Sequence, residues 1–279
     1  ARFSKENLYP EGPFRAGMAL DLLVSAAVST ALCGVLCYLA YVEDVLTLDG
    51  TVAAFGVGMV IGILGDVSWL LVLLFFLLSS FIATRYKFAL KEAMGVQEGV
   101  KGERRATNVL ANGIAPMAAA VLSYANPAWL PRDVSGVVFL SAIAVAGSDT
   151  LASEIGVLSQ KAYLITTFQR VTPGTDGGIS LLGQGCAVGA ALFTAVIGWF
   201  VLGDLARMYG LATTMPQAAS ILVIPAIIGF VGCQIDSVIG ASLERKGMVN
   251  KKTTNLLATS AGAVLAYLIL LTAYPGLIP

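Results

Sequence analysis

The sequence SGVVFLSAIAVAGSDTLASEIGVL, residues 135–158, decides the fold class, because a long apolar run ends in a group of polar side chains. A helix of about 20 apolar residues crosses the hydrocarbon core of a bilayer, and this stretch is long enough to do so. Its last part carries four polar side chains that fall on one side of a helix, namely Asp149, Thr150, Ser153 and Glu154. The stretch therefore predicts a membrane helix that brings charged groups to one end of the bilayer.

The composition extends this prediction to the whole chain. Of its 279 residues, 57% are hydrophobic and 12% are charged, whereas a soluble domain has about 25% charged residues. We therefore expect an all-α polytopic membrane protein that forms one domain over 1–279. The candidate spans are 18–41, 48–65, 67–84, 107–124, 135–158, 179–202, 218–240 and 254–273. Only Gly65 and Asp66 separate the second span from the third, so we expect seven or eight transmembrane helices. The polar positions 1–16 are expected to be partly an expression remnant or a processed end.

The basic residues predict the orientation. Most of them fall in three connections between spans, at Arg85, Lys87, Lys91, Lys101, Arg104, Arg105, Lys161, Arg170, Arg245, Lys246, Lys251 and Lys252. Cytoplasmic loops carry an excess of lysine and arginine, so this face is predicted to be cytoplasmic. With eight spans both termini lie on the other side, whereas seven spans would move the N-terminus to the basic side.

The connection 159–178 contains the most distinctive motif, which we call the glycine loop: TPGTDGGIS, residues 172–180. Its glycines let backbone N–H groups approach an anion closely. Its carboxylate is a hard ligand for Mg²⁺. The β-branched and aromatic residues of 161–171 favour a short β-hairpin that carries the loop. The candidate phosphate-binding residues here are Thr172, Gly174, Thr175, Asp176, Gly177, Gly178 and Ser180. An ordinary turn is the alternative interpretation of such a glycine-rich segment.

Further polar groups are predicted to reach the same face. They are Asn108 and Asn112 on one helix face, Asp236 and Ser237 at the end of a span, Lys251 and Lys252 before the last span, and Arg85 and Lys87 after the third. Ionisable groups inside a membrane are costly and call for a partner or a function. Together with the glycine loop they indicate a Mg²⁺–nucleotide site, with Asp149, Asp176 and Asp236 as candidate metal ligands. Hydrogen bonds between helices, or lysines that reach out to the interface, are the alternatives.

The absence of histidine narrows the chemistry, because histidine is the commonest general base. Phosphoryl transfer to an existing phosphate needs no strong base, since its nucleophile is already an anion. The four cysteines lie in apolar spans and are interpreted as packing residues. The glycine pairs Gly58/Gly62 and Gly185/Gly189 have the spacing that favours close helix packing.

The motifs TNVLANG, SDTLASEIG, TPGTDGGISLLGQ and QIDSVIGA, with LTLDG before them, resemble an integral-membrane family. It includes plant phytyl-phosphate kinase and the animal protein called transmembrane protein 19, and it is similar at a distance to CTP-dependent polyprenol kinases and CDP-diacylglycerol synthases. The resemblance covers the chain from about the second span to the last. It implies transfer of the γ-phosphate of CTP, or of another nucleoside triphosphate, to a prenyl monophosphate such as phytyl or geranylgeranyl phosphate.

The resemblance also implies roles for individual residues. Asp149, Glu154 and Asp176 would be the catalytic acids, and the glycine loop would bind the nucleotide phosphates. Asn108 and Asn112 would contact phosphate, and Lys251 and Lys252 would neutralise the triphosphate. Asp236 resembles the acidic position before the serine in the related cytidylyltransferases. The expected partners are a nucleoside triphosphate, Mg²⁺, a prenyl monophosphate and the bilayer, without nucleic acid, and a homo-oligomer is allowed. A lipid cytidylyltransferase and an ion-coupled transporter are the alternatives, although a transporter would favour midplane sites and inverted repeats.

Overall fold

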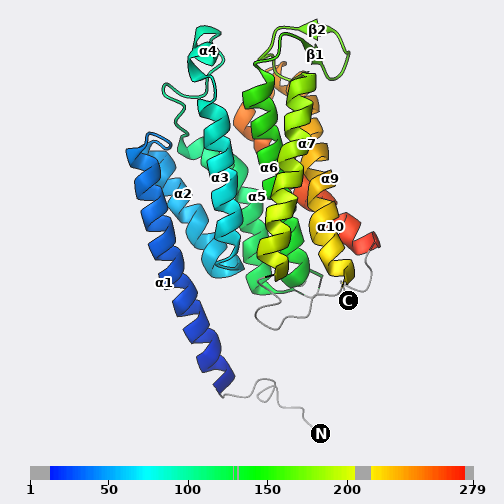
Figure 1. Cartoon of the computed structure of the whole chain (residues 1–279). Coiled ribbons are helices and arrows are strands. Elements are labelled where there is room, and N and C mark those ends of the chain that lie inside the picture. The colour runs from blue at the N-terminus through cyan, green and yellow to red at the C-terminus, as the bar shows by residue number, and fades with distance from the viewer. Residues whose placement is uncertain (1–12, 128, 131, 205–214, 274–279) are drawn as a thin grey trace.

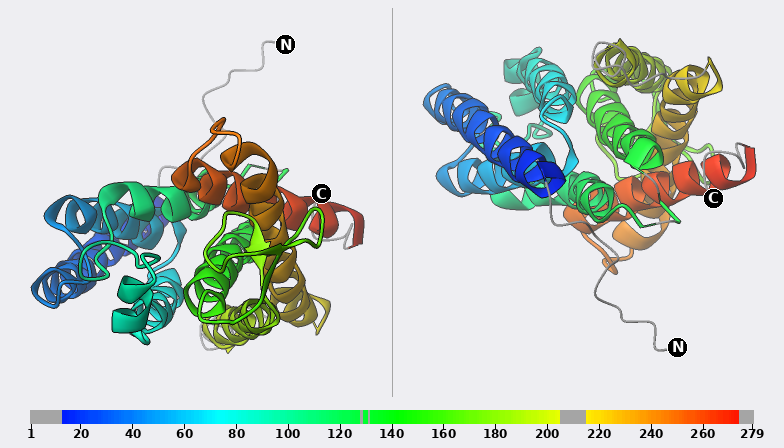
Figure 2. Two further views of the ribbon diagram at one scale, coloured as in Figure 1. Left: turned by 90° about the horizontal axis from the view of Figure 1, so that it is seen from above. Right: turned by 90° about the horizontal axis from the view of Figure 1, so that it is seen from below.

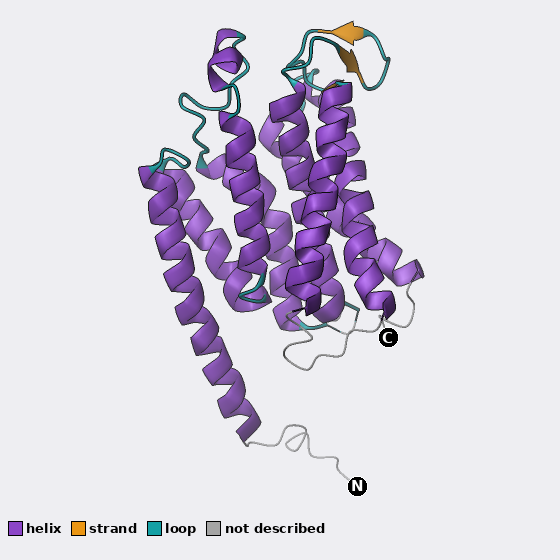
Figure 3. Ribbon diagram, in the orientation of Figure 1, coloured by secondary structure: helices purple, strands orange, loops and turns teal. Residues whose placement is uncertain are grey.

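The computed structural model describes residues 13–127, 129–130, 132–204 and 215–273, and these residues form a helical bundle with short strands at one end (Figures 1 and 3). The helices are α1 (Pro13–Val42), α2 (Leu48–Val60), α3 (Trp69–Arg85), α4 (Phe88–Ala93), α5 (Ala106–Ala125), α6 (Arg132–Gly156), α7 (Leu181–Gly198), α9 (Met215–Ile239) and α10 (Lys251–Ala273). Short π-helices extend α2, α7 and α9 as η2 (Ile61–Gly65), η3 (Trp199–Asp204) and η4 (Gly240–Glu244).

The predicted polytopic membrane fold is confirmed. Among the described residues, seven helices are long and apolar enough to cross a membrane, and α3 is a shorter apolar helix of 17 residues. The second and third predicted spans form a hairpin, because η2 ends at Gly65 and α3 begins at Trp69. Asp66 stabilises this turn by accepting a hydrogen bond from the backbone N–H of Ser68 at 2.8 Å.

Helix α6 lies at the centre of the bundle and packs against α3, α5, α7, α9 and α10. Its most apolar stretch is 94% buried, whereas that of α1 is only 11% buried. Small residues on the neighbours let them approach α6 closely: a Cβ atom at Gly232 of α9 or at Gly262 of α10 would collide with Val145. The helix that carries the four polar side chains Asp149, Thr150, Ser153 and Glu154 is therefore also the most buried of the candidate membrane helices.

A three-stranded antiparallel sheet follows α6, with strand order β2-β1-β3. The strands are β1 (Ala162–Leu164), β2 (Arg170–Val171) and β3 (Gly178–Ile179), and Tyr163 of β1 pairs with Arg170 on one side and Ile179 on the other. The short hairpin predicted in the connection 159–178 is thus present. The glycine loop connects β2 to the start of α7.

The sheet and the basic connections lie at the same end of the bundle (Figure 1). Seen from this end, the sheet lies over α6, α7 and α9, while α1 and α2 lie at the far edge of the bundle (Figure 2). The connections α3–α5, α6–α7 and α9–α10 all reach this end, which we call the sheet end (Figure 1). The predicted convergence of the polar motifs on one face is therefore observed, and its cytoplasmic orientation stays a prediction.

Candidate functional site

A cavity of about 320 Å³ opens at the sheet end, where four helices and two connections meet. It is enclosed by the end of α6, the starts of α7 and α10, the end of α9, residues 95–98 of the α4–α5 connection, and residues 173–180 of the glycine loop. Of the predicted site residues, the cavity is lined by Asp149, Glu154, Gly174, Thr175, Asp176, Gly177, Gly178, Ser180, Asp236, Ser237 and Lys251. Segments far apart in the sequence thus form one polar chamber.

Two carboxylates and one lysine form the centre of the cavity. Asp149 comes from α6, Asp236 from α9, and Lys251 is the first residue of α10. The Nζ atom of Lys251 lies 3.3 Å from Oδ1 of Asp236 and interacts electrostatically with Asp149. The exposed fraction of Asp236 is 3% and that of Asp149 is 8%. Two buried acids therefore share one cation.

Further acids give this centre an excess of negative charge. Glu244 of η4 interacts electrostatically with Lys251, Asp149 and Asp176, and its Oε2 atom accepts a hydrogen bond from Thr254 at 3.1 Å. Three carboxylates, those of Asp149, Asp236 and Glu244, thus interact with Lys251, and Asp176 adds a further negative charge beside Glu244. The sequence reasoning did not include Glu244 in the site, although it lies eight residues after Asp236.

The donor chemistry fits Mg²⁺. The buried Oδ2 atom of Asp236 has no hydrogen-bond partner among the described residues, and such a group normally has one. Mg²⁺ is commonly held by one or two carboxylates together with substrate phosphates and water. In the described part of the chain, no group of three or more His, Cys, Asp or Glu residues could hold a metal ion. A magnesium site at Asp149 and Asp236 stays a prediction.

The glycine loop packs directly on the end of α9. Gly174 and Gly177 have φ values of +90° and +71°, a region that favours glycine. A Cβ atom at Gly177 would collide with the backbone and side chain of Ala241 in η4. Inside the loop, the Thr175 hydroxyl donates to the carbonyl of Thr172 at 2.7 Å. Thr172 itself lines a second pocket beside Arg170 rather than the main cavity.

Ser180 has a structural contact as well as a place in the cavity wall. Its Oγ atom accepts a hydrogen bond from the N–H of Gly183 at 3.1 Å, which caps α7, and donates to the carbonyl of Gly156 at 3.0 Å. Gly156 and Gly183 allow the two helices to approach closely at this point. The cap therefore fixes the start of α7 against the end of α6.

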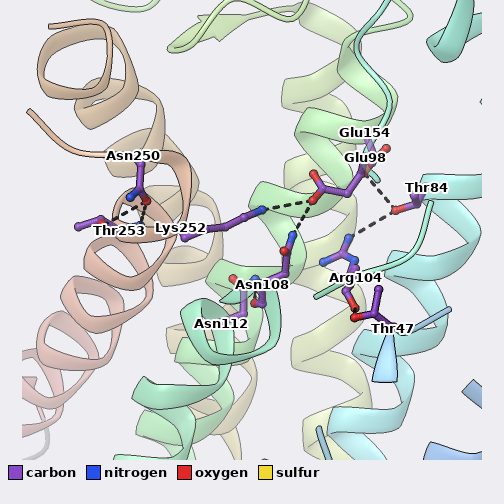
Figure 4. Close-up of polar contacts among 10 residues, drawn as sticks. All are labelled: Thr47, Thr84, Glu98, Arg104, Asn108, Asn112, Glu154, Asn250, Lys252 and Thr253. Carbon is purple, nitrogen blue, oxygen red and sulfur yellow. Dashed lines mark hydrogen bonds and ion pairs between the residues drawn. The ribbon is translucent and has the colours of Figure 1, made fainter. Parts of the chain in front are cut away.

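Asn108 and Lys252 meet at one carboxylate that the sequence analysis did not select. The Oε1 atom of Glu98 accepts a hydrogen bond from Asn108 Nδ2 at 2.6 Å and from Lys252 Nζ at 3.2 Å (Figure 4). Glu98 also lines the cavity, together with Gln97, whose buried Oε1 atom has no partner among the described residues. Asn112 lies one turn below Asn108 and donates to its carbonyl at 3.2 Å.

Glu154 is held from outside the cavity. Its Oε2 atom lies 2.7 Å from Nζ of Lys91 on α4, and its Oε1 atom accepts from Thr84 at 3.1 Å. Arg104 donates to the same threonine hydroxyl at 3.4 Å (Figure 4). In the sequence Lys91 resembles any other basic loop residue, so the local pattern contained no signal for this ion pair.

Six of the predicted phosphate-binding residues do not line the cavity, namely Asn108, Asn112, Thr172, Lys252, Arg85 and Lys87. Arg85 and Lys87 are directed away from it altogether. Arg85 donates to the carbonyls of Glu43 and Asp44 at 3.4 and 3.2 Å, because it ends α3 beside the α1–α2 connection. Lys87 adopts a left-handed conformation with φ of 51°, and its ammonium lies 5.5 Å from the ring centre of Tyr86. The turn between α3 and α4 directs both cations away from the site.

The comparisons with known proteins agree with the membrane fold. Residues 31–268 match the family described as integral membrane protein DUF92. The chain is 30% identical over 254 residues to an uncharacterized membrane protein of Methanocaldococcus jannaschii, a match that covers 91% of this chain and 98% of the relative. It is 33% identical over 229 residues to Protein VTE6, chloroplastic, of Arabidopsis thaliana, covering 80% of this chain and 65% of that protein. Protein PGR of Arabidopsis thaliana is 30% identical, with 74% and 75% covered. No solved structure gives a significant match.

Proposed function

Because the chain belongs to the DUF92 family of integral membrane proteins, we propose that it is a prenyl-phosphate kinase. In this proposal it transfers the γ-phosphate of CTP, or of a similar nucleotide, to a prenyl monophosphate such as phytyl or geranylgeranyl phosphate. The observation that carries the proposal is the cavity at the sheet end, where Asp149, Asp236 and Lys251 lie beside the glycine loop. The resemblance to a family that includes plant phytyl-phosphate kinase supports the same chemistry.

The proposed reaction makes modest demands on the protein. An oxygen of the prenyl phosphate forms a bond to the γ-phosphorus, the bond from that phosphorus to the β-phosphate oxygen breaks, and CDP leaves. The attacking oxygen is already an anion, so positioning and charge stabilisation supply most of the catalysis. The lack of histidine in the chain is compatible with this step.

The residues of the cavity have distinct tasks in this scheme. Lys251 stabilises the negative charge that develops on the phosphates, and its position is fixed by its ion pair with Asp236. The backbone N–H groups of the glycine loop bind the nucleotide phosphates. Asp149 and Asp236 would hold Mg²⁺, which neutralises phosphate charge when bound. Hydrogen bonds hold Glu154 at the cavity wall, where it positions the end of α6.

The membrane placement suits a lipid acceptor. The cavity lies at the end of a bundle whose outer helices expose large apolar side chains, for example Leu182 and Leu192 on α7. A prenyl tail would lie along such a surface while its phosphate reaches the cavity. The concentration of basic residues in the connections of this end favours a cytoplasmic site.

The test uses purified protein in detergent with Mg²⁺, γ-labelled CTP and geranylgeranyl or phytyl monophosphate. Label that appears in prenyl diphosphate supports the kinase. Label released as pyrophosphate, with formation of a CDP-lipid, would instead identify a lipid cytidylyltransferase. Absence of turnover with every prenyl phosphate and nucleotide would reject both enzymes and favour the ion-coupled transporter.

A further inference from the structure

We propose that Asn108 and Lys252 form the seat for the phosphate of the acceptor lipid, and that the carboxylate of Glu98 occupies this seat when no acceptor is bound. The ligand is a phosphomonoester dianion, and only its identity as the acceptor rests on the proposed function. The seat lies at the edge of the main cavity, because Glu98 belongs to the cavity wall. It is distinct from the centre formed by Asp149, Asp236 and Lys251.

The geometry is that of a small anion site. A single oxygen, Oε1 of Glu98, takes hydrogen bonds from Asn108 Nδ2 at 2.6 Å and from Lys252 Nζ at 3.2 Å (Figure 4). The two donors come from the first turns of α5 and α10, which belong to the bundle, whereas the acceptor comes from the connection between α4 and α5. The first turn of a helix favours anions through its free N–H groups and its dipole.

The electrostatics also favour an anion at this point. Burial raises the pKa of Glu98, but the charge of Lys252 and the hydrogen bond from Asn108 outweigh that effect, so its pKa is lowered overall. Arg104 adds to the lowering of this pKa. A site that stabilises the charge of one carboxylate should stabilise a phosphate dianion more strongly, because phosphate brings more charge and more acceptor oxygens.

Glu98 is held less tightly in the seat than Glu154 is held in its buried ion pair. Its side chain is 36% exposed, whereas the side chain of Glu154 is 11% exposed and its partner Lys91 has no exposed surface. Gly95, three residues before Glu98, and Gly99, the residue after it, both have positive φ values. Glu98 belongs to this connection and not to α5 or α10, so its replacement by a ligand leaves the two helices that supply the donors in place. Exchange of a carboxylate for a phosphate would therefore occur at the existing donors.

The test is an equilibrium binding measurement with the full chain in lipid nanodiscs, without nucleotide and without Mg²⁺. The ligand is geranylgeranyl monophosphate, and the variants are Glu98→Gln, which keeps the shape, and Glu98→Ala, which removes the group. Both are expected to bind the ligand about tenfold more tightly than the wild type, because the internal competitor is gone. Lys252→Met is expected to weaken binding by a similar factor. Asp44→Asn is the matched control, since Asp44 pairs with Lys101 at 3.0 Å on the surface.

Inorganic phosphate and CTP, measured in the same way, show whether the site binds the phosphate of the acceptor or a phosphate of the nucleotide. Tighter binding of both geranylgeranyl monophosphate and inorganic phosphate by the Glu98 variants, with unchanged binding of CTP, supports the acceptor seat. Tighter binding of CTP alone would assign the site to the nucleotide and overturn the proposal, and so would unchanged affinity for every ligand. If the Glu98 effect is present but no turnover occurs, the proposed function fails and the seat stands. If the protein turns over but the Glu98 variants do not bind the ligand more tightly, the acceptor seat is rejected and the proposed function stands.

Discussion

The ammonium of Lys91 lies 2.7 Å from the Oε2 atom of Glu154, and the Lys91 side chain has no exposed surface. The same ammonium donates to the carbonyls of Ala83 and Thr84 at 2.8 and 3.1 Å, which belong to the last turn of α3. A single cation therefore connects α4, the end of α3 and the end of α6. Because Glu154 lines the cavity, this ion pair fixes part of the cavity wall.

Replacement of Lys91 by methionine should destabilise the protein strongly. It leaves Glu154 and two helix carbonyls without their cation, and breaking a buried ion pair from one side costs about 3–5 kcal/mol. The expected result is a clear fall in the melting temperature in detergent. Lys101→Met is the control, because the Lys101–Asp44 pair is exposed and contributes at most about 1 kcal/mol. Equal melting temperatures for the two variants would contradict the structural role of Lys91.

Asp149→Asn and Asp236→Asn should reduce turnover by about a hundredfold or more, because each removes charge from the centre that would hold Mg²⁺. The measurement is the rate of prenyl diphosphate formation as a function of Mg²⁺ concentration, with melting temperatures as a check on folding. Asp44→Asn should leave turnover unchanged, since this surface acid lies outside the cavity lining. Near-normal rates in both Asp149→Asn and Asp236→Asn would show that these two acids do not hold a catalytic metal ion.

The contact of Glu98 with Lys252 and Asn108 should depend on pH. The pKa of Glu98 is lowered from its ordinary value of 4.5 in the folded protein. The contact therefore stabilises the fold above pH 4.5, and this stabilisation is lost as the pH falls through the lower folded value. The difference in melting temperature between wild type and Glu98→Gln should shrink between pH 7 and pH 3. A difference that stays constant over this range would show that the charge of Glu98 has no part in stability.

Hydropathy predicted the helices of the bundle, because apolar length decides what crosses a membrane. The polar motifs were harder to interpret, since a cap and a ligand use the same residue types. Asp49 of the LTLDG motif accepts hydrogen bonds from the Thr47 hydroxyl at 2.6 Å and from the N–H of Ala106 at 3.0 Å. It therefore ties the start of α5 to the start of α2. That contact joins residues 57 positions apart, which no local pattern reveals.

The two glycine pairs illustrate the same limit. Gly58 and Gly62 pack against Cys33 and Ser29 of α1, so a Cβ atom at either position would collide with α1. Gly185 and Gly189 have the same spacing, yet the space beside them is open. The spacing predicts a helix face without bulky side chains. Whether another helix packs against that face depends on the arrangement of the whole bundle. Lys91 and Glu98 escaped prediction for the same reason.

Gly177→Ala should impair the site more than an ordinary glycine substitution. Gly177 and Gly247 both have positive φ values, of 71° and 70°, so alanine introduces backbone strain of about 1–2 kcal/mol at each. Only at Gly177 would the new methyl group also collide with Ala241, whereas nothing lies within 4 Å at Gly247. We expect Gly177→Ala to lower turnover at least about tenfold by displacing the glycine loop from η4. Gly247→Ala should retain turnover close to that of the wild type.

Melting temperatures and turnover together separate the two effects of alanine. Backbone strain should lower the melting temperature of both variants by similar amounts, while loss of loop position should appear only as lower turnover in Gly177→Ala. A Gly177→Ala protein with wild-type turnover would mean that the packing of the loop on η4 does not set the geometry of the cavity. A Cβ atom at position 177 would collide with both the backbone nitrogen and the side chain of Ala241. Adding Ala241→Gly to the Gly177→Ala variant removes only the side-chain part of this collision, so the double variant should recover only part of the lost turnover.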